Sequence, residues 1–407
     1  MVNRGFFFIL GFNSQKEEFL IGIRKYNEVL EIGTFHKGID NQEKKLLIQT
    51  ITSNQIQSKD GTIYIDPGIC VELSFRAIEN GKLRDAVFNT FKFDIEWEQC
   101  TWERLILNNM AVDQEVAFTN LDKVIWEKPL IRKEGLLAYL SEVASFMLPF
   151  LKERALTVIR YPNGIKGESF FQKNCPEYAP SFIQRTEKEG TDFVVCDNLS
   201  TLLWLGNQLA IEYHVPFQAI HEDRPLEIVF DLDPPNRASF SLAVKAAVEL
   251  KRIFEGFDIV SFPKLSGSKG IQIHIPIADR RFTYSETRLF TSFIADYLID
   301  QFPDDFTIER FKKNRGKRLY IDYVQHAEGK TLICPYSTRG KEDATVAAPL
   351  FWDEVNEKLK LETFNIPFVL DRLTKIKCPM EGFFEQDNDS LTKVISMLKE
   401  NKRKTNY

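Results

Sequence analysis

The hydrophobic pattern changes along the chain, and the change predicts two regions of different architecture. From about residue 6 to 94, short apolar runs alternate with turn-forming clusters such as Asp60-Gly61 and Asp66-Pro67-Gly68. This alternation is typical of β-strands, with one helical interruption near 41–51. The expected strands are 6–10, 18–23, 30–32, 62–65 and 70–75. The pattern predicts a small β-barrel over residues 1–98.

The spacing of apolar positions becomes helical at about residue 133. The spacing of apolar residues predicts an amphipathic helix at 133–152. It also predicts a strand at 157–160 that ends at a Pro-Asn-Gly turn. Strands and helices then alternate to about residue 360, which predicts an α/β or α+β second region. The expected divisions are a linker at 99–117, a second domain at 118–395 and a basic tail at 396–407.

The amino-acid composition is that of a globular protein. Hydrophobic residues make up 43% and charged residues 27%, as in globular proteins, which argues against a disordered or collagenous chain. The longest apolar runs fall short of the roughly 20 residues that span a bilayer, and we expect no signal peptide. The cysteines are scattered without metal-ligand spacing, which favours a reducing cytoplasm.

The net charge of −5 means that any nucleic-acid binding depends on local basic patches. Two such patches occur: six basic residues among ten in Glu309–Arg318, and Lys402-Arg403-Lys404 near the C-terminus. Each could equally be a solvated face or tail. The patches permit a nucleic-acid partner without requiring one.

Paired acids follow an apolar run in Ile228-Val-Phe-Asp231-Leu-Asp233-Pro-Pro. On a strand, Asp231 and Asp233 share one face, and Pro234-Pro235 should end the hydrogen-bond ladder. Carboxylates this close repel unless a cation lies between them, and their oxygen atoms suit Mg²⁺ or Mn²⁺. The alternative is a strand-terminal turn with a capping aspartate.

Two further segments strengthen the metal hypothesis. The loop Ser266-Gly-Ser-Lys269-Gly270 could offer backbone N–H groups and an ammonium to phosphates, although it lacks the Walker A spacing. Asp322 lies in another apolar strand, where an unpaired carboxylate is costly, although a salt bridge could satisfy it. Together with the basic run at 309–318, these residues describe a two-metal phosphoryl-transfer site.

Ordered motifs across residues 118–355 carry a family resemblance. They are Phe170-Phe-Gln-Lys173, Glu212-Tyr-His214, Phe230-Asp-Leu-Asp-Pro-Pro235, Lys264-Leu-Ser-Gly-Ser-Lys-Gly270, Ile321-Asp-Tyr323, Pro335-Tyr-Ser-Thr-Arg339 and Pro349-Leu-Phe-Trp-Asp-Glu354. This set resembles the polymerase domain of bacterial LigD-type end-joining proteins, a branch of the archaeo-eukaryotic primase superfamily. The first 95 residues resemble the OB fold of ATP-dependent DNA ligases, chiefly at 81–88 and 91–94. The implied fold class is α+β, with an OB barrel before a primase-like, RRM-like core of mixed sheet and helices.

The resemblance also implies roles for individual residues. Asp231, Asp233 and Asp322 match the metal-binding acids, and His214 matches a nucleotide-binding histidine. Three residues match contacts to the incoming triphosphate: Ser266, Lys269 and Arg339. Lys123 and Lys133 match a pair that grips the DNA 5′-phosphate, although they could be solvated. Phe170 and Phe171 match aromatics that stack near the template base; core packing could explain only one of two adjacent strand residues.

Two departures from the family pattern stand out. Gln272 occupies a nucleotide-binding position where the family usually has His, and Gln cannot carry a proton charge. His274 lies on the same strand face and could compensate. In addition, no adenylation domain precedes the OB-like region, so we expect that this chain is not a self-sufficient DNA ligase.

The implied function is template-directed, gap-filling nucleotidyl transfer at DNA double-strand breaks in non-homologous end joining. The resemblance implies two divalent metal ions with Mn²⁺ preferred over Mg²⁺, NTP or dNTP substrates with ribonucleotides favoured, and DNA gaps with a 5′-phosphate. It further implies Ku as a partner, a possible separate ligase, no membrane, and a cytoplasmic, nucleoid-associated location. The alternatives are a primase that initiates chains and a non-catalytic scaffold that binds DNA ends.

Overall fold

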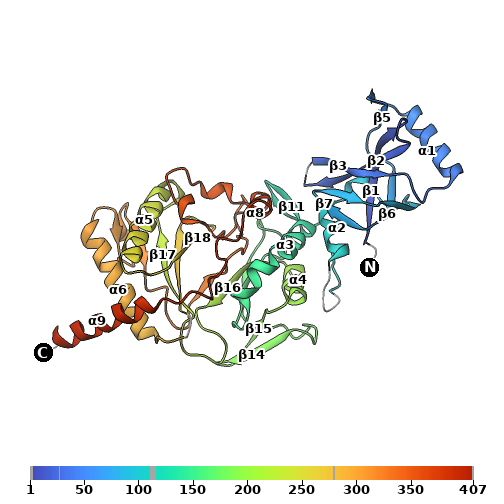
Figure 1. Cartoon of the computed structure of the whole chain (residues 1–407). Coiled ribbons are helices and arrows are strands. Elements are labelled where there is room, and N and C mark those ends of the chain that lie inside the picture. The colour runs from blue at the N-terminus through green and yellow to red at the C-terminus, as the bar shows by residue number, and fades with distance from the viewer. Residues whose placement is uncertain (1–2, 27, 111–115, 278–279, 406–407) are drawn as a thin grey trace. The chain divides into compact units, whose positions relative to one another are not determined.

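The computed structural model describes the whole chain except residues 1–2, 27, 111–115, 278–279 and 406–407. The chain divides into two compact units, which are described separately (Figure 1). The first unit comprises Met1–Asp113, Thr119–Val124 and Leu130–Ser141; the second comprises Gln114–Phe118, Ile125–Pro129 and Glu142–Tyr407.

The first unit is built around a curled antiparallel sheet. Its elements are β1 (Asn3–Asn13), β2 (Glu18–Lys25), β3 (Glu28–Phe35), α1 (Asn41–Ser53), β4 (Gln57–Lys59), β5 (Thr62–Tyr64), β6 (Cys70–Phe75), β7 (Ala77–Glu79), β8 (Lys82–Arg84), β9 (Val87–Phe91), η1 (Trp97–Gln99) and α2 (Trp102–Asn109). The long strand β1 pairs with β2, β5 and β6, which curls the sheet around a core of phenylalanine and isoleucine side chains. The backbones are so close at Gly11 that a Cβ there would lie 2.2 Å from the Ile63 carbonyl oxygen.

The structure adds detail to two expectations for this region. Part of the predicted linker at 99–117 is helix α2, whose Leu105 lies in the same core as the sheet. Residues 111–115 of that linker lie outside the described residues. The predicted helix at 41–51 is confirmed as α1, which begins where the Asp40 carboxylate accepts from the N–H groups of Gln42 and Glu43.

Short elements follow before the second unit's sheets: β10 (Val124–Glu127), β11 (Leu130–Arg132) and α3 (Lys133–Leu151). Helix α3 was predicted as amphipathic, but most of its side chains are buried. It is long and apolar enough to cross a membrane by length and composition. Because 67% of that stretch is buried inside the protein, as in an ordinary core helix, it is weak evidence for a membrane span.

The second unit contains two main sheets and a hairpin. Its elements are β12 (Thr157–Arg160), β13 (Phe170–Gln172), β14 (Gln184–Lys188), β15 (Thr191–Val195), α4 (Leu199–Asn207), β16 (Ala210–Pro216), β17 (Glu227–Asp233), η2 (Arg237–Ser239), α5 (Phe240–Gly256), β18 (Phe262–Leu265), β19 (Ile271–Pro276), α6 (Tyr284–Gln301), β20 (Phe306–Thr307), α7 (Lys312–Arg315), β21 (Leu319–Asp322), β22 (Thr331–Ile333), η3 (Trp352–Glu354), η4 (Leu361–Thr363), α8 (Ile366–Leu373) and α9 (Asp389–Thr405). We name the sheets by their inner strands: the β16 sheet has the order β13-β12-β16-β22, and the β17 sheet has the order β18-β19-β17-β21-β20.

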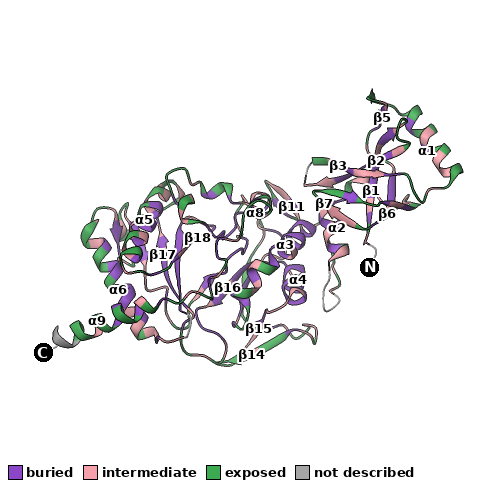
Figure 2. Cartoon of the chain, viewed as in Figure 1, coloured by how far each residue is buried: buried purple, intermediate pink, exposed green. Residues whose placement is uncertain are grey.

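The β17 sheet is mixed, as predicted, because β20 and β21 are parallel whereas its other pairs are antiparallel. Helices α5 and α6 pack against it (Figure 1), and strands β17 and β18 are largely buried (Figure 2). The α+β class is therefore confirmed. The predicted basic tail at 396–407 is helical up to Thr405 as part of α9, and residues 406–407 lie outside the described residues.

Candidate active site

The predicted acids lie on neighbouring antiparallel strands of the β17 sheet. Asp231 and Asp233 occupy alternate positions of β17, which ends directly before Pro234 as expected. In the pairing of β17 with β21, Asp322 stands opposite Asp231. The alternation along β17 and the register with β21 therefore place three carboxylates on one patch of the sheet.

The Asp231 carboxyl lies at the buried side of this patch. Burial, together with the charges of Asp233 and Asp322, raises its pKa to about 7. Gln272 Nε2 donates to Asp231 Oδ1 at 3.1 Å, and Lys264 Nζ donates to Gln272 Oε1 at 2.6 Å. Lys264 is completely buried, and this burial lowers its pKa to about 7. Gln272 thus links a buried lysine to an acid.

The other two acids have protein partners of their own. Asp233 forms ion pairs with Lys269 at 2.8 Å and with Arg315 at 3.4 Å. Asp322 Oδ1 accepts from the Tyr320 hydroxyl at 3.1 Å and from the Gln325 backbone N–H at 2.9 Å. Burial raises the Asp322 pKa above its ordinary value.

The donor set fits a hard divalent cation, because the charges of Asp233 and Asp322 raise the pKa of Asp231 and a cation would relieve that repulsion. In the part of the chain that the structure describes, however, no three Asp, Glu, His or Cys side chains already converge on one metal position. In this arrangement the Asp233 carboxylate is engaged by Lys269 and Arg315.

The Ser266–Gly270 loop has a compact conformation that differs from one expectation. Ser266 Oγ accepts from the backbone N–H groups of Ser268, Lys269 and Gly270 at 3.0–3.3 Å, so these amides are already bonded instead of being offered to phosphates. Gly267 has φ +68°, and a Cβ there would meet backbone atoms of residues 346–347 at 2.9 Å. The cation of this loop is Lys269, whose Nζ pairs with Asp233 at 2.8 Å and donates to the Pro234 carbonyl at 2.7 Å.

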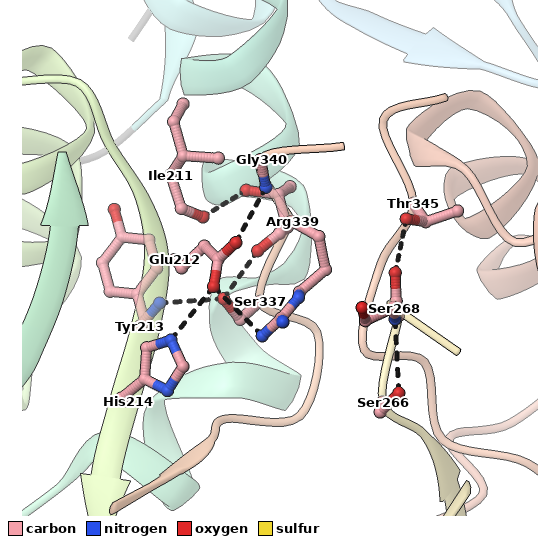
Figure 3. Close-up of polar contacts among 12 residues, drawn as sticks. Ile211, Glu212, Tyr213, His214, Ser266, Ser268, Ser337, Arg339, Gly340 and Thr345 are labelled. Atoms are coloured by element: carbon pink, nitrogen blue, oxygen red, sulfur yellow. Dashed lines mark hydrogen bonds and ion pairs between the residues drawn. The ribbon is translucent and has the colours of Figure 1, made fainter. Parts of the chain in front are cut away.

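Across the site, His214 and Arg339 share one acid that sequence reasoning did not identify as functional. Figure 3 shows Glu212 between them: its Oε2 lies 3.1 Å from His214 Nε2 and 3.0 Å from Arg339 Nη1. Its Oε1 accepts from the Gly340 backbone N–H at 2.9 Å. The signal was present in the sequence, since residues 212 and 214 occupy alternate positions and so share a strand face.

One pocket of about 250 Å³ brings most of the predicted residues together. Its lining includes the predicted residues His214, Asp231, Asp233, Ser266, Lys269, Gln272 and Arg339. Gln325 also lines it but was not predicted, although it follows Asp322 by three positions. The pocket lining therefore combines two carboxylates with an imidazole, a guanidinium and the Lys269 ammonium, which is paired with Asp233.

Phe170 and Phe171 do not line this pocket. Both rings are exposed, at 45% and 72%, so core packing explains neither residue. They lie on β13, which pairs with β12, and the Arg160 guanidinium lies 5.4 Å from the centre of the Phe170 ring. Adjacent exposed rings beside a cation suit base stacking.

Lys123 and Lys133 lie in the first unit. The Lys133 backbone N–H donates to the Lys123 carbonyl at 2.8 Å, which brings the two residues side by side. Lys133 is 3% exposed, and its Nζ donates to the Thr119 carbonyl at 2.6 Å. Burial and the neighbouring charge of Lys123 lower the Lys133 pKa to about 8.

Comparisons with known proteins agree with these motifs. A family model described as LigD, primase-polymerase domain matches residues 132–380. The Bifunctional non-homologous end joining protein LigD of Bacillus subtilis (strain 168) is 46% identical over 392 residues, which is 96% of this chain and 64% of that protein. The corresponding multifunctional LigD of Mycolicibacterium smegmatis is 32% identical over 267 residues, 64% of this chain and 35% of that protein.

A solved structure extends the comparison to the fold. The polymerase domain of Mycobacterium tuberculosis ligase D in complex with DNA superposes with a TM-score of 0.62 at 29% identity, covering 66% of this chain and 98% of that one. The chain spans less than two thirds of the length of the curated LigD proteins named above. The family model covers the part of the chain that carries the pocket, and the chain belongs to the LigD primase-polymerase family.

Proposed function

We propose that this protein is a template-directed nucleotidyltransferase that fills gaps at DNA double-strand breaks in bacterial non-homologous end joining. The observation that carries the proposal is the pocket in which Asp231 and Asp233 face Lys269, Arg339 and His214. Acids beside cations in one pocket suit a metal-bound triphosphate. Membership of the LigD primase-polymerase family supports the same reaction class.

In this proposal Asp231, Asp233 and Asp322 hold two divalent metal ions, with Mn²⁺ preferred over Mg²⁺. Such ions, when bound, lower the pKa of the primer 3′-hydroxyl and neutralise charge on the leaving pyrophosphate. Lys269, which pairs with Asp233 in this structure, would be free to contact a phosphate if Asp233 held a metal ion. The Lys269 ammonium would thus compensate the charge of Asp233 before metal binding and the charge of a phosphate after it.

The remaining residues orient the substrates. Ser266, Lys269 and Arg339 bind the triphosphate of an incoming NTP or dNTP, with ribonucleotides favoured, and His214 and Gln272 complete the nucleotide site. Phe170 and Phe171 offer their exposed rings to the template base. We further propose an OB-type domain at 1–98 and a polymerase domain at 118–395, Ku and possibly a separate ligase as partners, and a cytoplasmic, nucleoid-associated location.

Primer extension on gapped DNA tests the function. With Mn²⁺ and all four NTPs, the chain should add the nucleotide complementary to the template base, and little of any mismatched one. Binding of DNA ends without any addition would show a non-catalytic scaffold instead. Synthesis of dinucleotides on an unprimed template would show a chain-initiating primase.

We predict that Lys123 and Lys133 recognise the downstream 5′-phosphate, so a gap with this phosphate is bound more tightly than one ending in hydroxyl. Charge-assisted contacts contribute roughly 1.5–3 kcal/mol each before screening, so Lys123→Ala/Lys133→Ala should weaken binding at least about tenfold. Fluorescence anisotropy with both gap substrates measures this. The exposed Lys375, changed to Ala, is the matched control, and equal affinity of the parent for both gaps contradicts the prediction.

The preference for a gap with a 5′-phosphate over one ending in hydroxyl should also depend on pH. Because the Lys133 pKa is lowered to about 8, its ammonium is charged below that pH and neutral above it. The advantage of the phosphate-bearing gap should therefore shrink as the pH rises from 7 to 9. An advantage that stays constant over this range would exclude Lys133 as the responsible group.

A further inference from the structure

Glu212 occupies an unusual place beside the pocket. It is 4% exposed and does not line the pocket, whereas its partners His214 and Arg339 both do. Its two carboxylate oxygens accept from three groups, namely His214, Arg339 and the Gly340 backbone N–H (Figure 3). The carboxylate therefore lies behind the two side chains that face the pocket.

These contacts come from segments distant in sequence. Glu212 and His214 lie on β16, whereas Arg339 and Gly340 belong to the loop after β22. Side-chain hydroxyls hold this loop on the strand: Ser337 Oγ accepts from the Tyr213 N–H at 2.9 Å, and Thr338 Oγ1 donates to the Ile211 carbonyl at 2.5 Å. Residues 337 and 338 are thus held without Glu212, whereas the Gly340 N–H and the Arg339 guanidinium contact Glu212 itself.

The electrostatics show that this carboxylate is ionised. Burial alone would raise the Glu212 pKa, yet the bond from His214, the charge of Arg339 and the Gly340 N–H lower it below its ordinary value. A buried carboxylate with three donors is a rigid anchor. A long arginine side chain that is already anchored loses less conformational freedom when it binds a ligand.

We propose that Glu212 is a positioning residue that holds His214 and Arg339 in the orientation that binds the nucleotide, without touching the nucleotide itself. The inference rests on the proposed function of the pocket. Because Glu212 engages Nε2 of His214, the ring presents Nδ1 to the ligand. Glu212 adds negative charge near a site for a triphosphate and therefore cannot help to bind it by attraction. Its contribution to binding is the orientation of His214 and Arg339.

The charge of Glu212 and its orienting role predict opposite effects of Glu212→Gln on nucleotide binding. If Glu212 acted only through its charge, Glu212→Gln would remove a repulsive acid and tighten nucleotide binding. If Glu212 orients its partners, Glu212→Gln should weaken binding about tenfold, because two side chains must then be ordered on binding. The effect should raise the nucleotide KM in single-nucleotide extension and leave the affinity for DNA unchanged.

A double-mutant cycle shows whether Glu212 acts through Arg339. In an Arg339→Met background, Glu212→Gln should add little further loss, whereas independent roles would give additive losses. Glu354→Gln is the matched control, because Glu354 pairs with the buried Arg372 outside the pocket lining. Its nucleotide KM should equal that of the parent, and an increase as large as that of Glu212→Gln would overturn the specific role.

A measurement without nucleotide tests the positioning role of Glu212 separately from the proposed nucleotidyltransferase function. In NMR spectra of the full chain, the Arg339 side-chain N–H should exchange slowly with water in the parent and rapidly in Glu212→Gln. Unchanged exchange would overturn the positioning role. A parent that shows this protection but binds no NTP would contradict the proposed function and leave the anchoring role of Glu212 standing.

Discussion

Asp231→Asn should abolish nucleotide addition, with a fall in rate of about 10³-fold or more. The substitution preserves the shape of the side chain and its bond to Gln272, but it removes the charge of the acid that stands opposite Asp322 and lies on the same strand as Asp233. Loss of a metal-binding charge costs several kcal/mol of transition-state stabilisation, and each 1.36 kcal/mol is a factor of ten. Single-turnover extension of a gapped duplex with Mn²⁺ measures the rate.

The same variant should bind gapped DNA nearly as well as the parent, because carboxylates repel phosphates and do not bind them. Direct titration with Mn²⁺, followed by electron paramagnetic resonance, should show weakened metal binding. Asp371→Asn is the control, since Asp371 is an exposed helical residue paired with Lys375. Extension by Asp231→Asn within tenfold of the parent would refute the metal assignment.

Arg154→Met should destabilise the second unit by about 3–5 kcal/mol, which is the usual cost of removing one partner from a buried ion pair. Arg154 is 1% exposed, and its Nη1 donates to Glu227 at 2.9 Å and to the Pro216 carbonyl at 3.0 Å. Glu227 also bonds His274 Nδ1 at 2.7 Å. Without Arg154, Glu227 remains buried beside a neutral or weakly basic imidazole. Urea unfolding measures the change.

The exposed pair Lys375–Asp371 provides the comparison, and Lys375→Met should cost no more than about 1 kcal/mol. A similarly small loss in Arg154→Met would show that the buried network does not stabilise the unit. Replacing both partners, as Arg154→Met/Glu227→Gln, should cost less than Arg154→Met alone, because no uncompensated charge then remains buried.

The buried contacts among Arg154, Glu227 and His274 also predict how the stability of the second unit changes in acid. Burial would raise the pKa of Glu227, but Arg154 and His274 overcome it and lower that pKa to about 2. The folded value lies below the ordinary one of 4.5, so this stabilisation is complete above about pH 4.5 and is lost as the pH falls towards 2. In Arg154→Met the folded pKa of Glu227 should lie closer to its ordinary value, so less stability should be lost over this pH range.

Sequence reasoning located the elements whose signals are local. Strand β17 was predictable because its apolar residues alternate with Asp231 and Asp233 and because two prolines follow it. Helix α1 was predictable from its spacing and from Asp40 before its first turn. Such features depend on neighbours within a few positions, which the sequence shows directly.

Features that depend on distant segments were not predictable in the same way. The bond between Glu212 and Arg339 joins a strand to a loop well over a hundred residues away, so only the strand half of the pair was visible. The complete burial of Lys264 follows from the packing of β18 between other segments, and lysine is almost never fully buried. Helix α3 was expected to have a polar face, but its surroundings bury most of its sides.

The exposed rings of Phe170 and Phe171 have a consequence for handling the protein. Strand β13 lies at the end of the β16 sheet, so its outer backbone groups have no neighbouring strand within that sheet. An edge strand that also displays apolar rings invites edge-to-edge association between molecules. Its length of three residues and the Lys173 that follows limit this hazard. Concentrated protein should therefore be more soluble with a short single-stranded oligonucleotide that covers the rings.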